Sequence, residues 1–122
     1  MYMSRRIHIV EDDEDIRYIV SYILNDMGYE ISISETLADF RRQIAVEIPQ
    51  LILLDVMLPD GNGIDICRAL KSDPATAQIP VVIMSAHAAE KAVLEEACAD
   101  DFISKPFDLD LLLHRVKRIL AP

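Results

Sequence analysis

The sequence has few of the residues that build disulfide frameworks or metal-thiolate sites. It contains only two cysteines, Cys67 and Cys98, with no C-x-x-C spacing and no cluster of histidines. Isolated cysteines of this kind are typical of reduced, buried small residues. We therefore expect neither a disulfide bond nor a zinc site.

The chain also lacks long apolar runs. Its longest uninterrupted hydrophobic stretches have the length of a β-strand, so we expect no segment to span a bilayer. Residues 1–6 lead straight into an apolar stretch without a signal-peptide cleavage pattern. There is no internal repeat, low-complexity tract or linker. These absences predict a cytoplasmic protein with no membrane partner.

Basic residues are scarce. Twelve lysines and arginines stand against 21 acidic residues, which gives a formal net charge of −9 at pH 7. An anionic surface repels a phosphate backbone, so we expect no direct nucleic-acid binding by this chain, and cations or a basic partner are favoured. The 122 residues are 52% hydrophobic, which is enough for a real core and predicts one domain over residues 1–122.

Short apolar segments alternate with amphipathic ones along the whole chain. The predicted strands are residues 6–10, 30–34, 51–54, 80–84 and 101–104. Apolar residues recur at helical spacing in the segments between and after them, which are 13–27, 36–48, 64–70, 88–99 and 108–120. Alternation of this kind predicts an α/β fold, a mostly parallel sheet with right-handed crossovers and helices on both faces.

Local signals mark the ends of several helices. Thr36, with Asp39 three residues later, resembles a capping box, Asp108 is positioned to cap the last helix, and Gly28 stops the first. Residues 61–63 are predicted to form a flexible loop. The buried stripes of the first two helices are predicted to be Ile16, Ile19, Val20, Ile23, Leu24 and Met27, and then Leu37, Phe40, Ile44 and Ile48.

Four of the predicted strands run directly into residues that can carry chemistry. These residues are Glu11, Asp12, Asp55, Ser85 and Lys105. An acid after a strand is often only the cap of the next helix. In a parallel sheet, however, the carboxyl ends of the strands share one edge, and ligands bind there. We therefore expect the five side chains to converge.

Convergence of three carboxylates requires a compensating proton or cation. Hard oxygen ligands at a partly open site favour Mg²⁺, which keeps several waters and accepts a phosphate oxygen as a further ligand. A lysine and a hydroxyl at the rim supply donors for an anion. These parts are suited to binding a phosphoryl group, and a carboxylate such as Asp55 can itself be the nucleophile and form an aspartyl phosphate.

The sequence resembles the receiver domain of two-component response regulators, including the chemotaxis type, over essentially its whole length. The segments that carry the resemblance are residues 9–13, 54–63, 80–86 and 99–107. The resemblance implies a flavodoxin-like (βα)5 fold with a five-stranded parallel sheet of order 2-1-3-4-5 and five helices.

The resemblance also implies roles for the acidic residues. Asp55 matches the phosphoacceptor, which takes a phosphoryl group from the phosphohistidine of a sensor histidine kinase or a histidine phosphotransfer protein. Asp12, Asp55 and the backbone carbonyl of Met57 would bind Mg²⁺, with Glu11 acting on the metal through water. Such a domain is not an enzyme beyond its own phosphorylation and autodephosphorylation.

Other matched positions would form the switch. Lys105 would pair with Asp55 and later with the phosphoryl oxygens, Ser85 would hydrogen-bond the phosphate, and Phe102 would swing inward. The peptide before Pro106 matches the family's cis peptide. Met57 and His87 match positions that border the path of the hydrolytic water and tune the lifetime of the phosphate.

We expect the face formed by residues 88–99, 101–104 and 108–120 to change on activation and to bind a downstream effector, an output domain or a second copy of the chain. Two other functions remain open at this point. One is a scaffold that binds its partner regardless of phosphate, and the other is a small Mg²⁺-dependent phosphohydrolase with Asp55 as nucleophile. A stand-alone receiver and a piece of a longer regulator are both compatible with the sequence.

Overall fold

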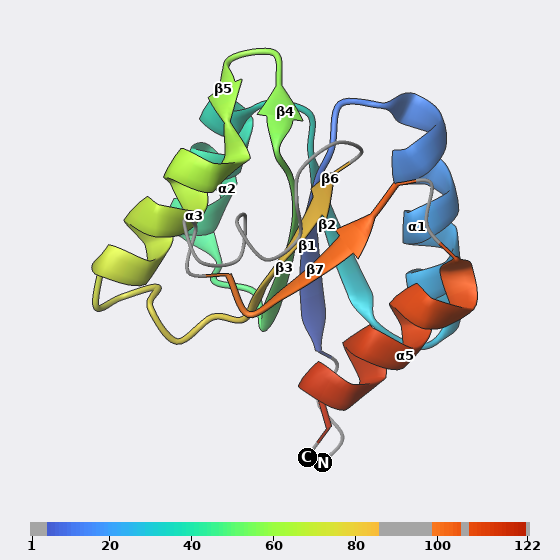
Figure 1. Ribbon diagram of the computed structural model, residues 1–122. Helices are drawn as coiled ribbons and strands as arrows, with labels where there is room; N and C mark the ends of the chain where they lie inside the picture. The colour runs from blue at the N-terminus through green and yellow to red at the C-terminus, as the bar shows by residue number, and fades with distance from the viewer. Residues whose placement is uncertain (1–4, 86–98, 106–107, 122) are drawn as a thin grey trace.

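A parallel β-sheet covered by helices on both faces makes up the protein (Figure 1). The computed structural model describes residues 5–85, 99–105 and 108–121. The strands of the main sheet are β1 (Arg6–Val10), β2 (Glu30–Ser34), β3 (Leu51–Asp55), β6 (Val81–Ser85) and β7 (Asp101–Ser104). The helices in the described ranges are α1 (Glu14–Asp26), α2 (Leu37–Val46), α3 (Gly63–Ser72) and α5 (Leu109–Ile119).

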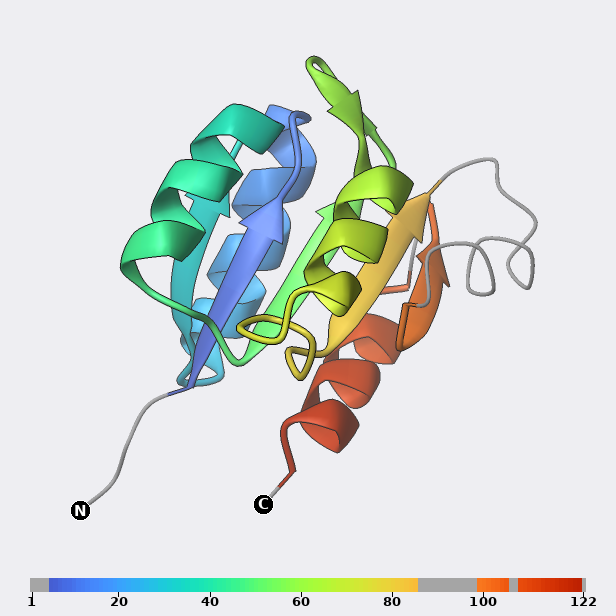
Figure 2. The same cartoon turned by 90° about the vertical axis from the view of Figure 1, so that its left-hand side faces the viewer.

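The order of the strands confirms the predicted topology. The five strands lie in the order β2-β1-β3-β6-β7, and every neighbouring pair is parallel. This order equals the predicted 2-1-3-4-5 once the short strands β4 and β5 are set aside. From β1 the chain adds β2 on one side of the sheet, and it then adds β3 on the other side of β1. The carboxyl ends of β1 and β3 therefore lie side by side, at the point where ligands bind in sheets of this type (Figure 2).

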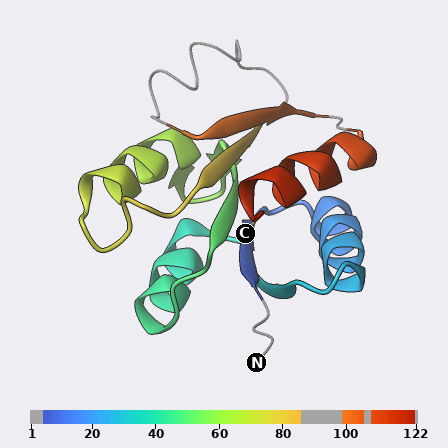
Figure 3. The same cartoon turned by 90° about the horizontal axis from the view of Figure 1, so that it is seen from below.

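The sheet separates two layers of helices, as the view from below shows (Figure 3), and each layer packs on the sheet over an apolar core of its own. Helices α2 and α3 cover one face. There Phe40 and Ile66 belong to the same apolar core as Leu54 of β3. Helices α1 and α5 cover the other face, where Val20 and Val116 pack. Strand β3 is buried along its whole length because both of its faces are covered.

The predicted cap and stop residues Thr36, Asp108 and Gly28 are confirmed, and Asp13 caps α1. The side chain of Asp13 accepts hydrogen bonds from the backbone N–H groups of the first turn of α1, and Asp108 does the same for α5. Thr36 Oγ1 accepts from the N–H of Asp39, 3.1 Å away, at the start of α2. Gly28 has a φ of +97°, a conformation that a side chain disfavours, directly after α1.

The buried stripes of the first two helices are narrower than predicted. Ile19 and Met27 are 42% and 41% exposed, because the side of α1 that meets the sheet is centred on Val20 and Leu24. Ile48 is also exposed, because α2 ends at Val46 and Ile48 lies in the connection to β3. These three positions were wrongly predicted to be buried.

The predicted loop at 61–63 is also corrected. Strands β4 (Met57–Leu58) and β5 (Gly61–Asn62) form an antiparallel hairpin, and α3 begins directly at Gly63. Gly63 packs against the backbone of β3 so closely that a Cβ atom at this position would lie 2.1 Å from the carbonyl oxygen of Asp55. The glycine is therefore required for close backbone contact beside Asp55, and the segment is ordered.

Side chains cover backbone groups on both edge strands of the sheet. On β2, Gln43 Nε2 donates to the carbonyl oxygen of Ile33 at 2.8 Å. On β7, Arg115 Nη1 donates to the carbonyl oxygen of Phe102 at 3.1 Å, and Asp101 Oδ1 accepts from the Phe102 N–H at 2.8 Å. Backbone groups on each edge strand are thus hydrogen-bonded by side chains of the helix packed beside that strand or of the strand itself.

Cys67 is buried, as predicted, and so is His8. Cys67 lies on α3 and is buried in the core that includes Phe40. His8 is buried on β1, where its Nε2 lies 2.6 Å from Ser34 Oγ and its ring meets the Phe40 ring edge-on. In the part of the chain that the structure describes, no helix is both long and apolar enough to cross a membrane.

Candidate functional site

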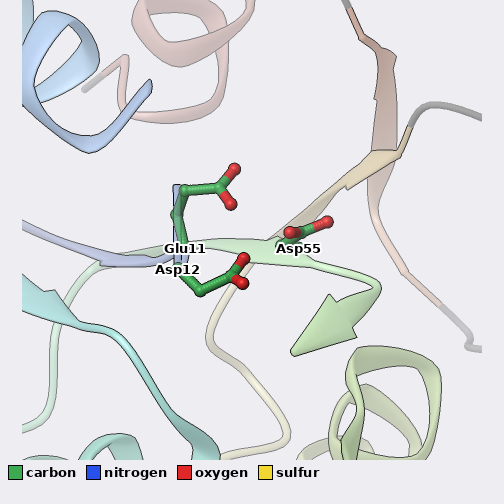
Figure 4. A group of neighbouring side chains, drawn as sticks. All are labelled: Glu11, Asp12 and Asp55. Carbon is green, nitrogen blue, oxygen red and sulfur yellow. The ribbon is translucent and has the colours of Figure 1, made fainter. Parts of the chain in front are cut away.

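Three carboxylates meet at the carboxyl edge of the sheet (Figure 4). Glu11 and Asp12 directly follow β1, and Asp55 is the last residue of β3. Because β1 and β3 are parallel neighbours, their ends point to the same side. One carboxylate oxygen from each residue lies within 4.8 Å of those from the other two. The predicted convergence of the acids therefore holds in the structure.

Lys105 lies between two of these acids. It follows β7, and its Nζ lies 3.3 Å from Asp55 Oδ2 and forms an ion pair with Glu11 Oε1. Its backbone N–H donates to the carbonyl oxygen of Ser85 at 2.9 Å, which fixes the chain at the point where the side chain leaves it. The ammonium group is largely buried, so water screens these ion pairs only weakly. Pairing with Glu11 as well as Asp55 was not predicted.

Burial and charge shape the protonation of this group. The pKa of Glu11 is raised to about 7, chiefly because the carboxyl group is buried; the hydrogen bond from Lys105 opposes this rise, and nearby Asp55 adds to it. Burial alone would lower the pKa of Lys105, but the hydrogen bonds and charges of Glu11 and Asp55 outweigh it, so its pKa is raised. Lys105 is therefore an ammonium ion at neutral pH and neutralises part of the acidic cluster.

The donor set fits a hard divalent cation. All the side-chain donors are carboxylate oxygens, and Asp12 is exposed while Glu11 and Asp55 are buried, which leaves one side of the cluster open to water. Hard cations such as Mg²⁺ bind through one or two carboxylates and keep several waters. The acidic pocket formed by Glu11, Asp12 and Asp55 could therefore hold a metal ion.

The remaining predicted residues in the described ranges lie around this pocket. Ser85 is the last residue of β6, the strand between β3 and β7, and is buried. Met57 is on β4, two residues after Asp55, with a side chain that is 73% exposed. Phe102 is on β7 and is already buried in the core on the α2 and α3 side.

Four predictions fall outside the described residues. These are the burial of Cys98, the cis peptide before Pro106, the position of His87 beside the pocket, and the helix expected over 88–99. They stay predictions. The same holds for the part of the switch face that residues 88–98 would form.

Two charged residues that sequence reasoning missed hold the loops around the pocket. Arg17 on α1 donates to the backbone carbonyls of Glu11 and Asp12. Asp60, at the tip of the β4–β5 hairpin, accepts from the N–H groups of Leu37 and Ala38 at 2.8 and 3.0 Å, and these hydrogen bonds lower its pKa. A charged residue among the apolar positions of α1 was the available signal for Arg17. Asp60 carried no local signal, because its partners lie more than 20 residues away.

Comparison with known proteins gives a consistent result. Residues 7–117 match the family described as the response regulator receiver domain. The chain is 38% identical over 120 residues to the phosphate regulon transcriptional regulatory protein PhoB of Escherichia coli, covering 97% of this chain and 52% of PhoB. It is 36% identical over 119 residues to the transcriptional regulatory protein GltR of Pseudomonas aeruginosa, covering 96% of this chain and 49% of GltR.

Solved structures agree with the sequence relatives. A crystal structure of a putative response regulator from Chloroflexus aurantiacus superposes with a TM-score of 0.90 at 30% identity, covering 98% of this chain and all of that one. The chain spans about half the length of the two curated relatives, so only one part of each is matched. Together with the strand order and the acidic edge, these matches show that the chain belongs to the response regulator receiver domain family of two-component systems.

Proposed function

We propose that Asp55 accepts a phosphoryl group from the phosphohistidine of a sensor histidine kinase or a histidine phosphotransfer protein. The observation that carries this proposal is the position of Asp55 at the sheet edge, within 4.8 Å of two other carboxylates and 3.3 Å from the Lys105 ammonium. A nucleophilic carboxylate needs neighbours that neutralise the charge of the incoming group, and this arrangement supplies them.

In the proposed step, an oxygen of Asp55 attacks the phosphorus of the phosphohistidine. A P–O bond forms, the P–N bond breaks, and its electron pair stays on the histidine nitrogen, which leaves as the imidazole of the donor. Lys105 already pairs with Asp55, so its ammonium can transfer its ion pair to the phosphoryl oxygens without a large movement. Ser85, at the end of the strand between them, is proposed to donate a hydrogen bond to the same oxygens.

The proposed cofactor is Mg²⁺. Asp12 and Asp55 would hold it through their carboxylates, Met57 through its backbone carbonyl, and Glu11 through a water molecule. When bound, a divalent cation neutralises charge on the phosphoryl oxygens during transfer. The carboxylate donor set and its open side support this assignment.

The proposed output is a change in partner binding. Phosphorylation adds nearly two negative charges and new acceptor oxygens at one point, which orders nearby groups. We propose that Ser85 and Phe102 respond and that the face of residues 88–99, β7 and α5 then binds an effector, an output domain or a second copy of the chain. The protein would act in the cytoplasm and would bind no nucleic acid through this domain.

Intact-mass measurement after incubation with acetyl phosphate and Mg²⁺ tests the proposal. We expect one slowly decaying phosphate adduct in the wild type, none in Asp55→Asn, and an unchanged adduct in Asp65→Asn, a matched change of an exposed aspartate on α3. Absence of the adduct in the wild type would favour a phosphate-independent scaffold. Rapid multiple turnover would favour a phosphohydrolase, and either result would overturn the proposed switch.

A further inference from the structure

The side chain of Arg17 contacts three residues near the acidic pocket: the backbone of Glu11 and Asp12, and the side chain of Glu35. Its Nη1 donates to the carbonyl oxygens of Glu11 and Asp12 at 3.0 and 2.9 Å. Its Nη2 lies 2.8 Å from Glu35 Oε1. The Arg17 side chain is only 13% exposed, so its guanidinium is shielded from water, whereas the Glu35 carboxylate is 66% exposed and stays solvated.

The two carbonyls belong to the segment where β1 has ended and α1 has not begun. The N–H of Glu11 donates to the carbonyl oxygen of Ser34 at 3.0 Å, which continues the hydrogen bonding between β1 and β2 by one residue. Arg17 Nη1 supplies a side-chain donor to both carbonyl oxygens of this segment. A carbonyl held in place fixes the plane of its peptide, and two consecutive planes determine the direction of the Cα–Cβ bond of Asp12 between them. Arg17 therefore sets the direction in which the Asp12 side chain leaves the backbone.

Glu35 gives this contact a second function. The guanidinium is a permanent cation close to a site that would bind another cation, which by itself would weaken metal binding. The carboxylate of Glu35, which follows β2, balances the charge of Arg17. The pair can thus hold the loop through hydrogen bonds while adding little net charge near the pocket.

We propose that Arg17 is a positioning residue that orients Asp12 and Glu11 for divalent metal binding, with Glu35 as its counter-ion. The inference rests on the proposed function, because it assumes that these carboxylates hold the metal. Groups that orient ligands without touching the metal affect affinity by about 10- to 100-fold.

The test measures Mn²⁺ binding by the loss of the free-ion electron paramagnetic resonance signal, with the thermal unfolding midpoint of each metal-free variant measured in parallel. Arg17→Met keeps the apolar stem and removes every donor. We expect it to raise the Kd for Mn²⁺ by about 10-fold or more. Arg17→Lys retains a donor for the two carbonyls but cannot contact Glu35 at the same time, so we expect a smaller increase in the Kd for Mn²⁺. Glu35→Gln leaves the cation unbalanced and should also weaken Mn²⁺ binding.

Matched variants separate positioning from general stability. Arg42→Met removes an exposed arginine that pairs with Asp39 on α2, and its Kd should equal that of the wild type. If Arg17→Met lowers the unfolding midpoint but leaves the Kd of the folded protein unchanged, Arg17 is only structural and the inference is overturned. If Arg17→Met does not fold, unchanged Kd values in both Arg17→Lys and Glu35→Gln overturn it.

The same titration distinguishes failure of the inference from failure of the proposed function. Asp12→Asn should lose most of the Mn²⁺ binding whether or not Arg17 positions it. A wild type that binds no Mn²⁺, or an Asp12→Asn variant that binds it normally, would contradict the metal site itself. Normal binding in the wild type, loss in Asp12→Asn and no effect of the Arg17 variants would contradict the inference alone.

Discussion

Lys105 and Asp55 come from strands that are not neighbours, and the Lys105 Nζ nevertheless lies 3.3 Å from Asp55 Oδ2. Strand β6 separates β3 from β7, so the lysine side chain reaches across the end of an intervening strand. Its second ion pair, with Glu11 at the end of β1, extends the connection further along the sheet. One ammonium group therefore links the ends of three strands.

Replacing this ammonium should make the protein more dependent on metal. In Lys105→Met, buried Glu11 loses its cationic partner, which costs about 3 kcal/mol of stability in the absence of metal. A divalent cation then meets less positive charge and binds more tightly. We expect Mg²⁺ to raise the thermal unfolding midpoint of Lys105→Met by more than it raises that of the wild type.

Lys71→Met is the control for this experiment. Lys71 also bridges segments, by donating to the carbonyl oxygen of Ile79 and pairing with Asp100, but it does not contact the acidic pocket. Lys71→Met should lower the thermal unfolding midpoint, but Mg²⁺ should raise that midpoint by the same amount as in the wild type. Equal increments in Lys105→Met and the wild type would show that Lys105 does not compete with the metal.

Adding a methyl group at Gly63 should displace the backbone of Asp55 and so disrupt the acidic pocket. In Gly63→Ala the Cβ would lie 2.1 Å from the carbonyl oxygen of Asp55, so the backbone of β3 or α3 must move. We expect a loss of at least about 3 kcal/mol in urea unfolding and a loss of the phosphate adduct. Gly28→Ala meets no atom and is strained only by its positive φ, so it should cost about 1 to 2 kcal/mol and keep the adduct.

The buried His8 should make stability fall as the pH falls. Burial lowers the pKa of His8 to about 4 in the folded protein, whereas the unfolded chain protonates near 6.5. Between these values the unfolded state binds the proton and the folded state does not, so stability is present above pH 6.5 and is lost progressively down to about pH 4. The maximum loss is about 3 kcal/mol.

Comparison with His8→Gln isolates this effect from the titration of the acids. We expect the difference in unfolding free energy between wild type and variant to change by up to about 3 kcal/mol from pH 7 to pH 4, with the wild type losing more. Urea titrations at several pH values provide the measurement. Parallel pH profiles for the two proteins would show that His8 protonates equally in both states.

The lifetime of the phosphate should depend on the residues that border Asp55. Met57 exposes most of its side chain on the hairpin that follows Asp55, so its removal should ease the approach of water. We expect the adduct of Met57→Ala to decay several-fold faster, followed by intact mass over time, and His87→Ala to change the decay rate as well. Unchanged decay in both variants would refute the assignment of these two positions.

Phosphorylation should alter backbone protection on the proposed switch face. We expect amide hydrogen exchange in residues 86–107 to change when the adduct forms, while exchange in β1 and β3 stays the same. Mass spectrometry of peptides from the wild type and Asp55→Asn, each with acetyl phosphate and Mg²⁺, provides the comparison. The switch proposal fails if this segment exchanges identically with and without the adduct.

The features predictable from the sequence are those set by neighbours in the chain. The cap residues Thr36 and Asp108 act on amides three and two positions away, so their signals are local. The convergence of Glu11, Asp12 and Asp55 was also predictable, because parallel strands bring their carboxyl ends to one edge.

The features that escaped prediction depend on packing between distant segments. The exposure of Ile19 follows from where α1 contacts the sheet, which its own periodicity does not determine. The contact of Asp60 with α2 and that of Lys105 with Glu11 join residues 23 and 94 positions apart. The ordered hairpin at 57–62 depends on how closely Gly63 meets β3, again a tertiary contact.

The side chains that satisfy the edge strands have a consequence for solubility. An open sheet presents backbone donors and acceptors to which a strand of another molecule can add, and repeated addition leads to aggregates. Gln43 on α2 already donates to a carbonyl of β2, and Arg115 on α5 already donates to a carbonyl of β7. A foreign strand must first displace an amide or a guanidinium from each, so intermolecular sheet extension is discouraged at both sides of the fold.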